Sequence, residues 1–92
     1  MIVHIGNDVV IPVKNIVAVI GIDTIESEDC NKEFLKKAKD RGFIKDISNN
    51  DKPKSVILAK AKDKCIVYLS PISSITIARR IAADKSAYNS IT

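Results

Sequence analysis

The chain has 92 residues, of which 46% are hydrophobic and 28% are charged. That is enough apolar material for one small domain, over residues 1–92, and too little length for two. The longest apolar run near the N-terminus, 16–22, is far shorter than the roughly 18 residues that cross a bilayer, and no basic segment precedes it. We therefore expect a cytoplasmic protein that does not enter the membrane, with 82–92 as a candidate flexible tail.

The charge is distributed unevenly along the chain. The net charge is +4, but residues 1–51 hold seven bases and nine acids, whereas residues 52–92 hold eight bases and two acids, a net of +6. A part of a fold with such an excess has a positive potential that attracts nucleic acid or an acidic partner.

The first quarter of the chain predicts β-structure. Residues 1–5 alternate in polarity, a Gly-Asn-Asp turn occupies 6–8, and the apolar 9–11 completes an N-terminal hairpin. Pro12 has no amide hydrogen and marks a strand end or an edge, after which the Ile- and Val-rich 16–22 predicts another strand. We expect three strands before any helix.

An amphipathic helix is predicted from Ser27 onward. Cys30, Phe34 and Ala38 recur at a spacing of four residues, which is the stripe of a helix. Ser27 suits the N-cap and Gly42 suits the position just after the helix. The bases near its end complement the helix dipole and pair with acids at i,i+4, so a solvated face explains them better than a nucleic-acid surface does.

The second half predicts a hairpin followed by a helix. A short strand is expected within 43–48, and the apolar runs 55–59 and 65–69 are separated by a polar "KAKDK". Because both runs are apolar on both faces, we expect this hairpin at the centre of the sheet, with the helix covering one face and another part of the chain covering the other. Ser73 or Ser74 then caps a C-terminal helix.

The predicted fold class is therefore α+β: a small, mainly antiparallel sheet of about five strands with two helices, one mid-chain and one C-terminal. The C-terminal helix is apolar over a wide arc that includes Ile72, Ile75, Ile77 and Ile81. This arc is either a subunit interface or part of the monomer's own core, and the pattern fits both equally.

Groups able to carry out catalysis are scarce. The one histidine, His4, lies in a predicted strand, where a structural or surface histidine is more common than a general base. Cys30 and Cys65 lack the spacing of a zinc site and predict reduced, partly buried thiols, and the three glycines are scattered singly, unlike a phosphate-binding loop. We expect no enzymatic activity, no metal, no cofactor and no small-molecule substrate.

Lysines surround the expected central hairpin. Lys60 and its neighbours lie in or beside the loop, where any exposed loop is polar. Lys52 and Lys54 flank Pro53, so a restricted backbone presents two ammonium groups close together at a sheet end. Positioned cations of this kind bind phosphates by displacing condensed counterions. By itself, this signal does not specify nucleic acid as the ligand.

Four segments together resemble a known family. "IVHIGNDVVIPVKNIVAVIGID", "FLKKAKDRG", "KPKSVILA" and "YLSPISSITIARRI" occur in the order and at the spacing of the small bacterial extracellular-matrix regulators RemA and RemB, over residues 1–81. "PKSVI" followed by "YLSPISS" is more similar to the RemB branch. The resemblance implies a DNA-binding transcriptional regulator of matrix and biofilm type, without enzymatic activity, whose subunits are similar to those that assemble into rings around which DNA wraps.

The resemblance also implies DNA-contacting residues. In RemA-like proteins these lie at the end of the N-terminal hairpin and in the basic run before the central hairpin. The first position corresponds here to Lys14 or its neighbour, and the second to Lys52 and Lys54. We add Lys60 and Arg80 as second-rank candidates. RemA-like members carry a dense arginine run where this chain has "DKPK", and lysine lacks the planar fork that grips phosphate through two hydrogen bonds.

Two hypotheses follow for the function. In the first, a homo-oligomer repeats a short basic site at fixed spacing, and avidity for double-stranded DNA arises from many weak contacts. In the second, the chain is a ring-forming protein-interaction module that binds an acidic protein or a paralogue and does not bind DNA.

Overall fold

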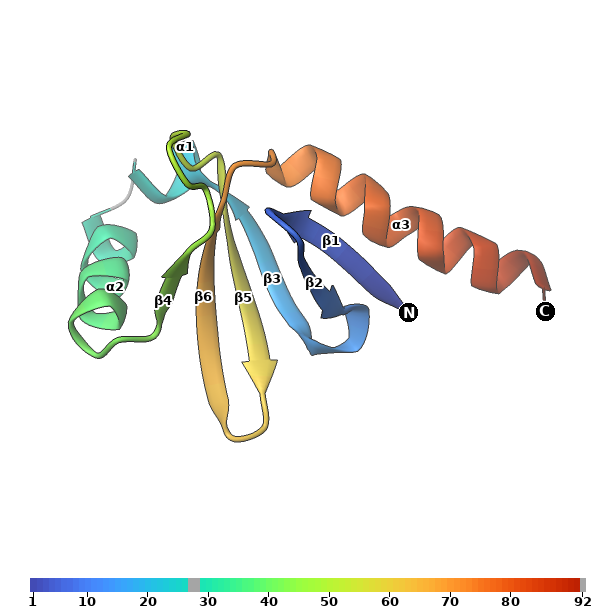
Figure 1. The fold of residues 1–92 in the computed structure, drawn as a ribbon, viewed down its shortest axis with the longest axis horizontal. Helices are drawn as coiled ribbons and strands as arrows, with labels where there is room; N and C mark the ends of the chain where they lie inside the picture. The colour runs from blue at the N-terminus through green and yellow to red at the C-terminus, as the bar shows by residue number, and fades with distance from the viewer. Residues whose placement is uncertain (27–28, 92) are drawn as a thin grey trace.

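The computed structural model describes residues 1–26 and 29–91, with side chains described for all of these except 26, 29–31 and 84–91. The fold is α+β, as predicted (Figure 1). Its elements in chain order are β1 (Ile2–Gly6), β2 (Val9–Pro12), the 3-10 turn η1 (Val13–Asn15), β3 (Ile16–Gly21), α1 (Ile22–Glu26), α2 (Asp29–Asp40), β4 (Ile44–Asp46), β5 (Ser55–Ala61), β6 (Lys64–Ser70) and α3 (Ser74–Ile91).

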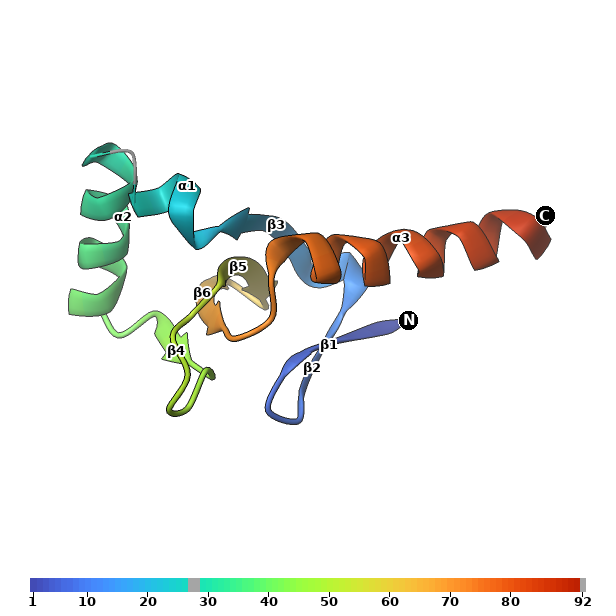
Figure 2. The same cartoon turned by 90° about the horizontal axis from the view of Figure 1, so that it is seen from above.

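The strands form two sheets instead of one. β1 and β2 pair as an isolated antiparallel hairpin, and a four-stranded sheet has the order β3-β5-β6-β4. The pairs within the larger sheet are antiparallel except β4 with β6, which is parallel. The chain turns at η1 between β2 and β3, so the hairpin crosses one face of the larger sheet and does not extend its edge (Figures 1 and 2).

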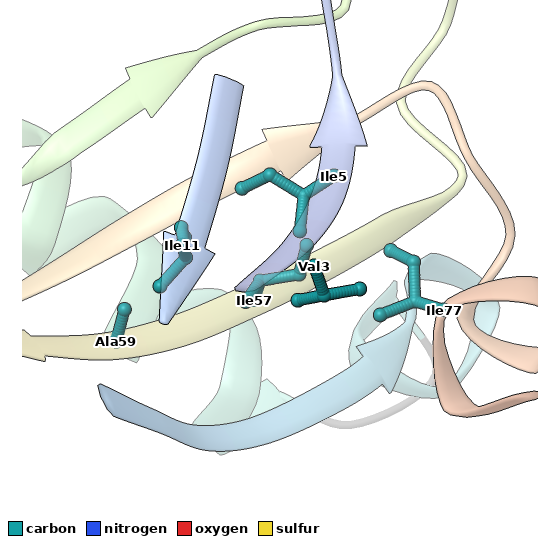
Figure 3. Packing of buried hydrophobic residues seen from close by; sticks show 6 residues of the cluster. All are labelled: Val3, Ile5, Ile11, Ile57, Ala59 and Ile77. Atoms are coloured by element: carbon teal, nitrogen blue, oxygen red, sulfur yellow. The ribbon is translucent and has the colours of Figure 1, made fainter. Parts of the chain in front are cut away.

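The central hairpin is buried on both faces, as its sequence predicts. Neighbouring residues of β5 point to opposite sides, and Val56 and Ile57 accordingly belong to two different hydrophobic clusters. On one face the hairpin β1–β2 and α3 cover the sheet, and Figure 3 shows their side chains meeting those of β5. The buried members of this cluster are Val3, Ile5, Ile11, Ile57, Ala59 and Ile77. On the other face α1 and α2 contribute, and the buried members are Ile25, Ala38, Val56 and Val67.

The short helix α1 was not expected from the sequence, which predicts strand through residue 22. The chain leaves the sheet at Gly21, and the amide of Ile22 donates a hydrogen bond to the carbonyl of Lys54 (3.1 Å). Ile22 and Ile25 are three residues apart, so both face the core from one side of a single helical turn. A turn of five residues is too short for its periodicity to stand out from the preceding strand.

The predicted mid-chain helix is α2, and its C-terminal end has the predicted glycine. Gly42 has a φ of +75°, which glycine adopts without strain. Its amide donates a hydrogen bond to the carbonyl of Lys39 (3.1 Å), and the amide of Phe43 donates one to the carbonyl of Ala38 (2.9 Å). These two bonds are those of a Schellman motif, which satisfies the last carbonyls of a helix. The predicted N-cap, Ser27, lies outside the described residues.

Ser73 is the N-cap of α3, one of the two residues that the sequence offered. Its hydroxyl accepts a hydrogen bond from the amide of Thr76 (3.2 Å), and the two hydroxyl groups are 3.0 Å apart. The helix continues through 82–91, the segment predicted as a candidate flexible tail, and it extends away from the rest of the fold (Figures 1 and 2). The flexibility of that segment stays a prediction. No helix among the described residues is long and apolar enough to span a membrane.

The apolar arc of α3 is mainly used inside the monomer. Ile77 is fully buried, and Ile81 is half-buried against the same cluster. Ile72 is also half-buried there, but it precedes the N-cap Ser73 and therefore lies before α3 and not in the helix as predicted. Ile75 is 64% exposed, because it lies about 200° around the helix from Ile77. The monomer's own core therefore accounts for three of these four isoleucines, and only Ile75 is left exposed for a contact with another subunit.

Buried serines fasten the hairpin and the start of α3 to the larger sheet. The hydroxyl of Ser70 donates to the carbonyl of Ile5 (2.6 Å) and accepts from the amide of Ile72 (3.0 Å). The hydroxyl of Ser55 donates to the carbonyl of Ile72 (2.7 Å). Each of these bonds gives a buried polar group the partner that it needs away from water. They fix the crossing of the hairpin over β6.

Candidate nucleic-acid interface

The predicted contact residues lie at two ends of the larger sheet. β3 and β5 are antiparallel, with Ile16 opposite Ala59, so Lys14 in η1 and Lys60 in β5 are at the same end. Lys52 and Lys54 precede β5 and lie at the other end. At about 3.3 Å per strand residue, the two pairs are roughly 20 Å apart. The structure therefore does not bring all four lysines into one cluster within a single subunit.

The segment that carries Lys52 and Lys54 is held by its backbone. The amide of Lys54 donates to the carbonyl of Ser70 (2.8 Å), and its carbonyl accepts from Ile22 (3.1 Å). Both lysine side chains are exposed, while Pro53 between them is half-buried. The two ammonium groups therefore project from a fixed stretch of chain at a sheet end, which is the location that the sequence predicts.

Carboxylates accompany these two lysines at the same end of the sheet. The carboxylate of Asp46 accepts hydrogen bonds from both the hydroxyl and the amide (2.9 Å) of Ser48. These bonds lower the pKa of Asp46 because they stabilise the ionised form. Asp51, also exposed, directly precedes Lys52. The positive potential at this end of the sheet is therefore smaller than the two lysines alone would produce.

The described side chains contain a single ion pair, between Lys37 and Glu33 on α2 (3.6 Å). Lys14, Lys52, Lys54 and Lys60 are all exposed and take no part in an ion pair there. Their charges are consequently available to an external anion, because no acid of the described chain neutralises them at contact distance.

Arg80 has a partner within the fold. Its guanidinium donates a hydrogen bond to the carbonyl of His4 in β1 (2.7 Å), which fastens α3 to the edge of the hairpin. The sequence does not reveal this contact, which joins residues 76 positions apart. A guanidinium has five N–H donors, so Arg80 retains others for a phosphate. A role for it in DNA binding stays a prediction.

The structure brings together further bases that the sequence did not single out. Arg41, Lys45 and Lys64 surround a hollow of about 350 Å³ beside Phe43. They converge because β4 pairs in parallel with β6, with Ile44 opposite Val67. Sequence periodicity indicates which face of a strand is apolar but not which strand is its neighbour, so no signal in the chain predicts this cluster.

An apolar hollow adjoins Lys14. It has a volume of about 410 Å³ and lies between the start of β3 and the second turn of α3. Val17, at its margin, is 63% exposed, whereas Ile81 opposite is half-buried. We call this surface the β3–α3 hollow; it is lined by Val13, Lys14, Ile16, Val17, Ala18, Val19 and Ile81.

The described side chains do not form a group of three or more His, Cys, Asp or Glu residues that could hold a metal ion. His4 is exposed on the outer side of β1. The expectation of a partly buried thiol is wrong for Cys65, which is exposed in β6 near the free end of the β5–β6 hairpin. The side chain of Cys30 lies outside the described residues.

The fold and its surface define a small α+β protein with unneutralised lysines at both ends of a central sheet. Residues 2–81 match the RemA-like family, described as Extracellular matrix regulatory protein A-like, and the chain belongs to this family. The match confirms the resemblance to RemA and RemB, while the assignment to the RemB branch stays a prediction. None of the curated protein sequences matches the chain. The family description identifies the protein broadly as an extracellular matrix regulatory protein.

Proposed function

We propose that this protein is a DNA-binding transcriptional regulator of matrix and biofilm genes that acts in the cytoplasm as a homo-oligomer. The observation that carries the proposal is the state of the four candidate lysines, which are exposed and, within the described part of the chain, outside any ion pair. Binding double-stranded DNA through phosphates requires such free cations, and each phosphate neutralised releases condensed counterions.

Oligomerisation is part of the proposal because one subunit offers few contacts. Two lysine pairs roughly 20 Å apart neutralise about four phosphates at most. Copies held in a closed assembly repeat these pairs at fixed spacing, and later contacts then become intramolecular, which raises the overall affinity by orders of magnitude. The shortage of exposed arginine at the candidate positions favours recognition through phosphates and DNA shape over recognition of base edges.

The test of this function is fluorescence anisotropy of a labelled duplex of about 40 base pairs, titrated with the protein at several salt concentrations. We expect cooperative binding whose affinity falls steeply with salt, since the contacts are with phosphates. Binding that does not change with salt would contradict phosphate recognition. An absence of binding even at low salt would remove DNA as the ligand.

The β3–α3 hollow is the surface that we propose for contact between subunits. It is apolar, it lies beside the edge strand β3, and it contains the exposed Val17. Exposed apolar surface next to a strand edge favours association with another chain. We expect Val17→Asp to convert the assembly to smaller species, because a buried, unpaired carboxylate is costly.

Light scattering coupled to size exclusion measures this change directly. Val10→Asp is the matched control, since Val10 is 50% exposed on β2 and outside the hollow. Equal dissociation of both variants would point to a general effect of the added charge. An unchanged mass for Val17→Asp would place the subunit contact elsewhere.

A further inference from the structure

A second apolar hollow lies between α2 and β6, on the face of the larger sheet that α2 covers. Its volume is about 260 Å³. Ala38 and Val67 form its floor, with exposed fractions of 7% and 2%. Phe34 and Phe43 form its walls, and Lys37 and Arg41 lie at its rim. We call it the phenylalanine hollow.

Both walls are held in place by the backbone. Phe34 and Ala38 are four residues apart and lie on one face of α2, and Arg41 directly follows the helix, with its amide bonded to the carbonyl of Lys37 (3.1 Å). Phe43 is fixed at both of its backbone polar groups: its amide bonds to the carbonyl of Ala38 and its carbonyl accepts from the amide of Val67, each at 2.9 Å. The hollow therefore exists before any partner binds, which reduces the entropic cost of binding.

The two phenylalanines are unusually exposed for their type. Phe34 is 49% exposed and Phe43 is 41% exposed, and they are the only phenylalanines of the chain. Large aromatic side chains contribute most when they are buried, and pairs left open around a pocket are typical anchors for a partner. The apolar floor between them continues this surface into the fold.

The rim of the phenylalanine hollow is positively charged. Arg41 and Phe43 also line the adjoining hollow that contains Lys45 and Lys64, so four bases surround the two connected depressions. Among the described side chains, only Lys37 of these bases has an acidic partner, Glu33 at 3.6 Å. A partner that fills this surface must therefore supply negative charge around an apolar group.

We propose that the phenylalanine hollow docks an acidic segment of another protein, which inserts one large apolar side chain between Phe34 and Phe43. Carboxylates beside that side chain pair with Arg41 and with the neighbouring lysines. The volume of 260 Å³ is below the ~300–1,000 Å³ of small-molecule sites and suits a single anchoring side chain. Duplex DNA offers negative charge but no apolar side chain to fill the hollow, so the observations favour a protein segment.

This site is separate from the lysine pair proposed as a first-rank DNA contact. Cys65, which lines the hollow, is opposite Lys60 in the register of the β5–β6 hairpin. Ser70 is opposite Ser55 at the other end of the hairpin, next to Lys54. Lys60, a second-rank DNA candidate, lies at the same end of the hairpin as the hollow, so only substitutions of Lys52 and Lys54 are expected to reduce DNA binding without affecting peptide docking.

The chain's two phenylalanines permit a direct test. Full-length protein labelled with 4-fluorophenylalanine has two fluorine NMR signals, both from the walls of the hollow. The probe is a ten-residue peptide of Asp and Glu with a central Leu-Phe pair. One control peptide has Ser-Ser at the centre, and another has Lys in place of every acid. We expect the probe alone to shift both signals in a saturable way.

Substitutions locate the binding. We expect Phe34→Ser, checked for folding by circular dichroism, to reduce the affinity for the probe peptide at least tenfold, with the fluorine signal of residue 43 as the reporter. Arg41→Gln, on the exposed rim, should reduce the affinity for the probe peptide at least threefold and make that affinity less dependent on salt. Lys36→Gln, an exposed α2 residue outside the hollow, and the double variant Lys52→Ala/Lys54→Ala should leave it unchanged.

Three results would overturn the proposal. The first is the absence of a saturable shift with the Leu-Phe probe. The second is equal binding of the Ser-Ser peptide, which would show that only charge is recognised. The third is a shift of both signals by duplex DNA without peptide, which would assign the hollow to a DNA surface.

Discussion

Replacing Ile77 with alanine is expected to reduce the free energy of unfolding by about 2–5 kcal/mol, as large-to-small substitutions in a packed core do. Ile77 is fully buried where α3 meets the N-terminal hairpin, in the cluster that contains Ile5 and Ile57. Small domains have a total stability of about 5–15 kcal/mol, so this loss is a large fraction. Urea denaturation followed by circular dichroism measures it, with an unchanged m-value if the same surface unfolds.

Ile75→Ala is the matched control for this substitution. It removes the same atoms from the same helix, two residues earlier, but from a side chain that is 64% exposed. We expect a change within about 0.5 kcal/mol. Equal losses from the two substitutions would mean that α3 does not dock on the hairpin through Ile77.

The double substitution Lys52→Ala/Lys54→Ala is expected to lower the salt dependence of duplex binding. The dependence of log affinity on log salt should fall by about 1.8 for each subunit that contacts the DNA, since two phosphate contacts are lost at ~0.9 each. Because subunits act together, the loss of affinity should multiply across the assembly. Anisotropy titrations at several salt concentrations measure the slope, and light scattering should show an unchanged oligomer.

A second double variant, Lys36→Ala/Lys39→Ala, removes the same charge from the exposed side of α2. It should leave the slope nearly unchanged if DNA contacts the sheet end that carries Lys52 and Lys54. Similar slopes for both variants would indicate a diffuse attraction without a defined site. An unchanged affinity in the folded Lys52 and Lys54 variant would exclude these two residues from the interface.

The sequence predicts which segments form helices and strands better than it predicts which of these elements lie next to one another. Apolar runs on both faces of 55–59 and 65–69 correctly place a hairpin at the centre of the sheet, and Gly42 correctly marks the end of α2. The spacing of apolar residues and the chemistry of turn residues are local properties of the chain, and they identify these features directly. They do not reveal that β1–β2 crosses the sheet as a separate hairpin, since that depends on the turn at η1 and on Ser70 bonding to Ile5.

The same distinction applies to the candidate site. The excess of lysine in the second half of the chain is visible in the sequence, and the structure confirms that the candidate lysines are exposed. The location of Lys14 at the same end of the sheet as Lys60, and at the opposite end from Lys54, requires the antiparallel pairing of β3 with β5. The group of Arg41, Lys45 and Lys64 requires the parallel pairing of β4 with β6. Both pairings are long-range, and no local pattern encodes them.

The position of β5 between two cores has a consequence for synthesis of the chain on the ribosome. The hairpin β1–β2 is made before β5, yet its apolar side is covered by Ile57 and Ala59 of β5 and by Ile77 of α3. At about 5–20 residues per second, several seconds pass between completion of the hairpin and arrival of those partners. During that interval Val3, Ile5 and Ile11 lack these partners, so the nascent hairpin exposes apolar side chains to chaperones and to premature contact with a neighbouring chain.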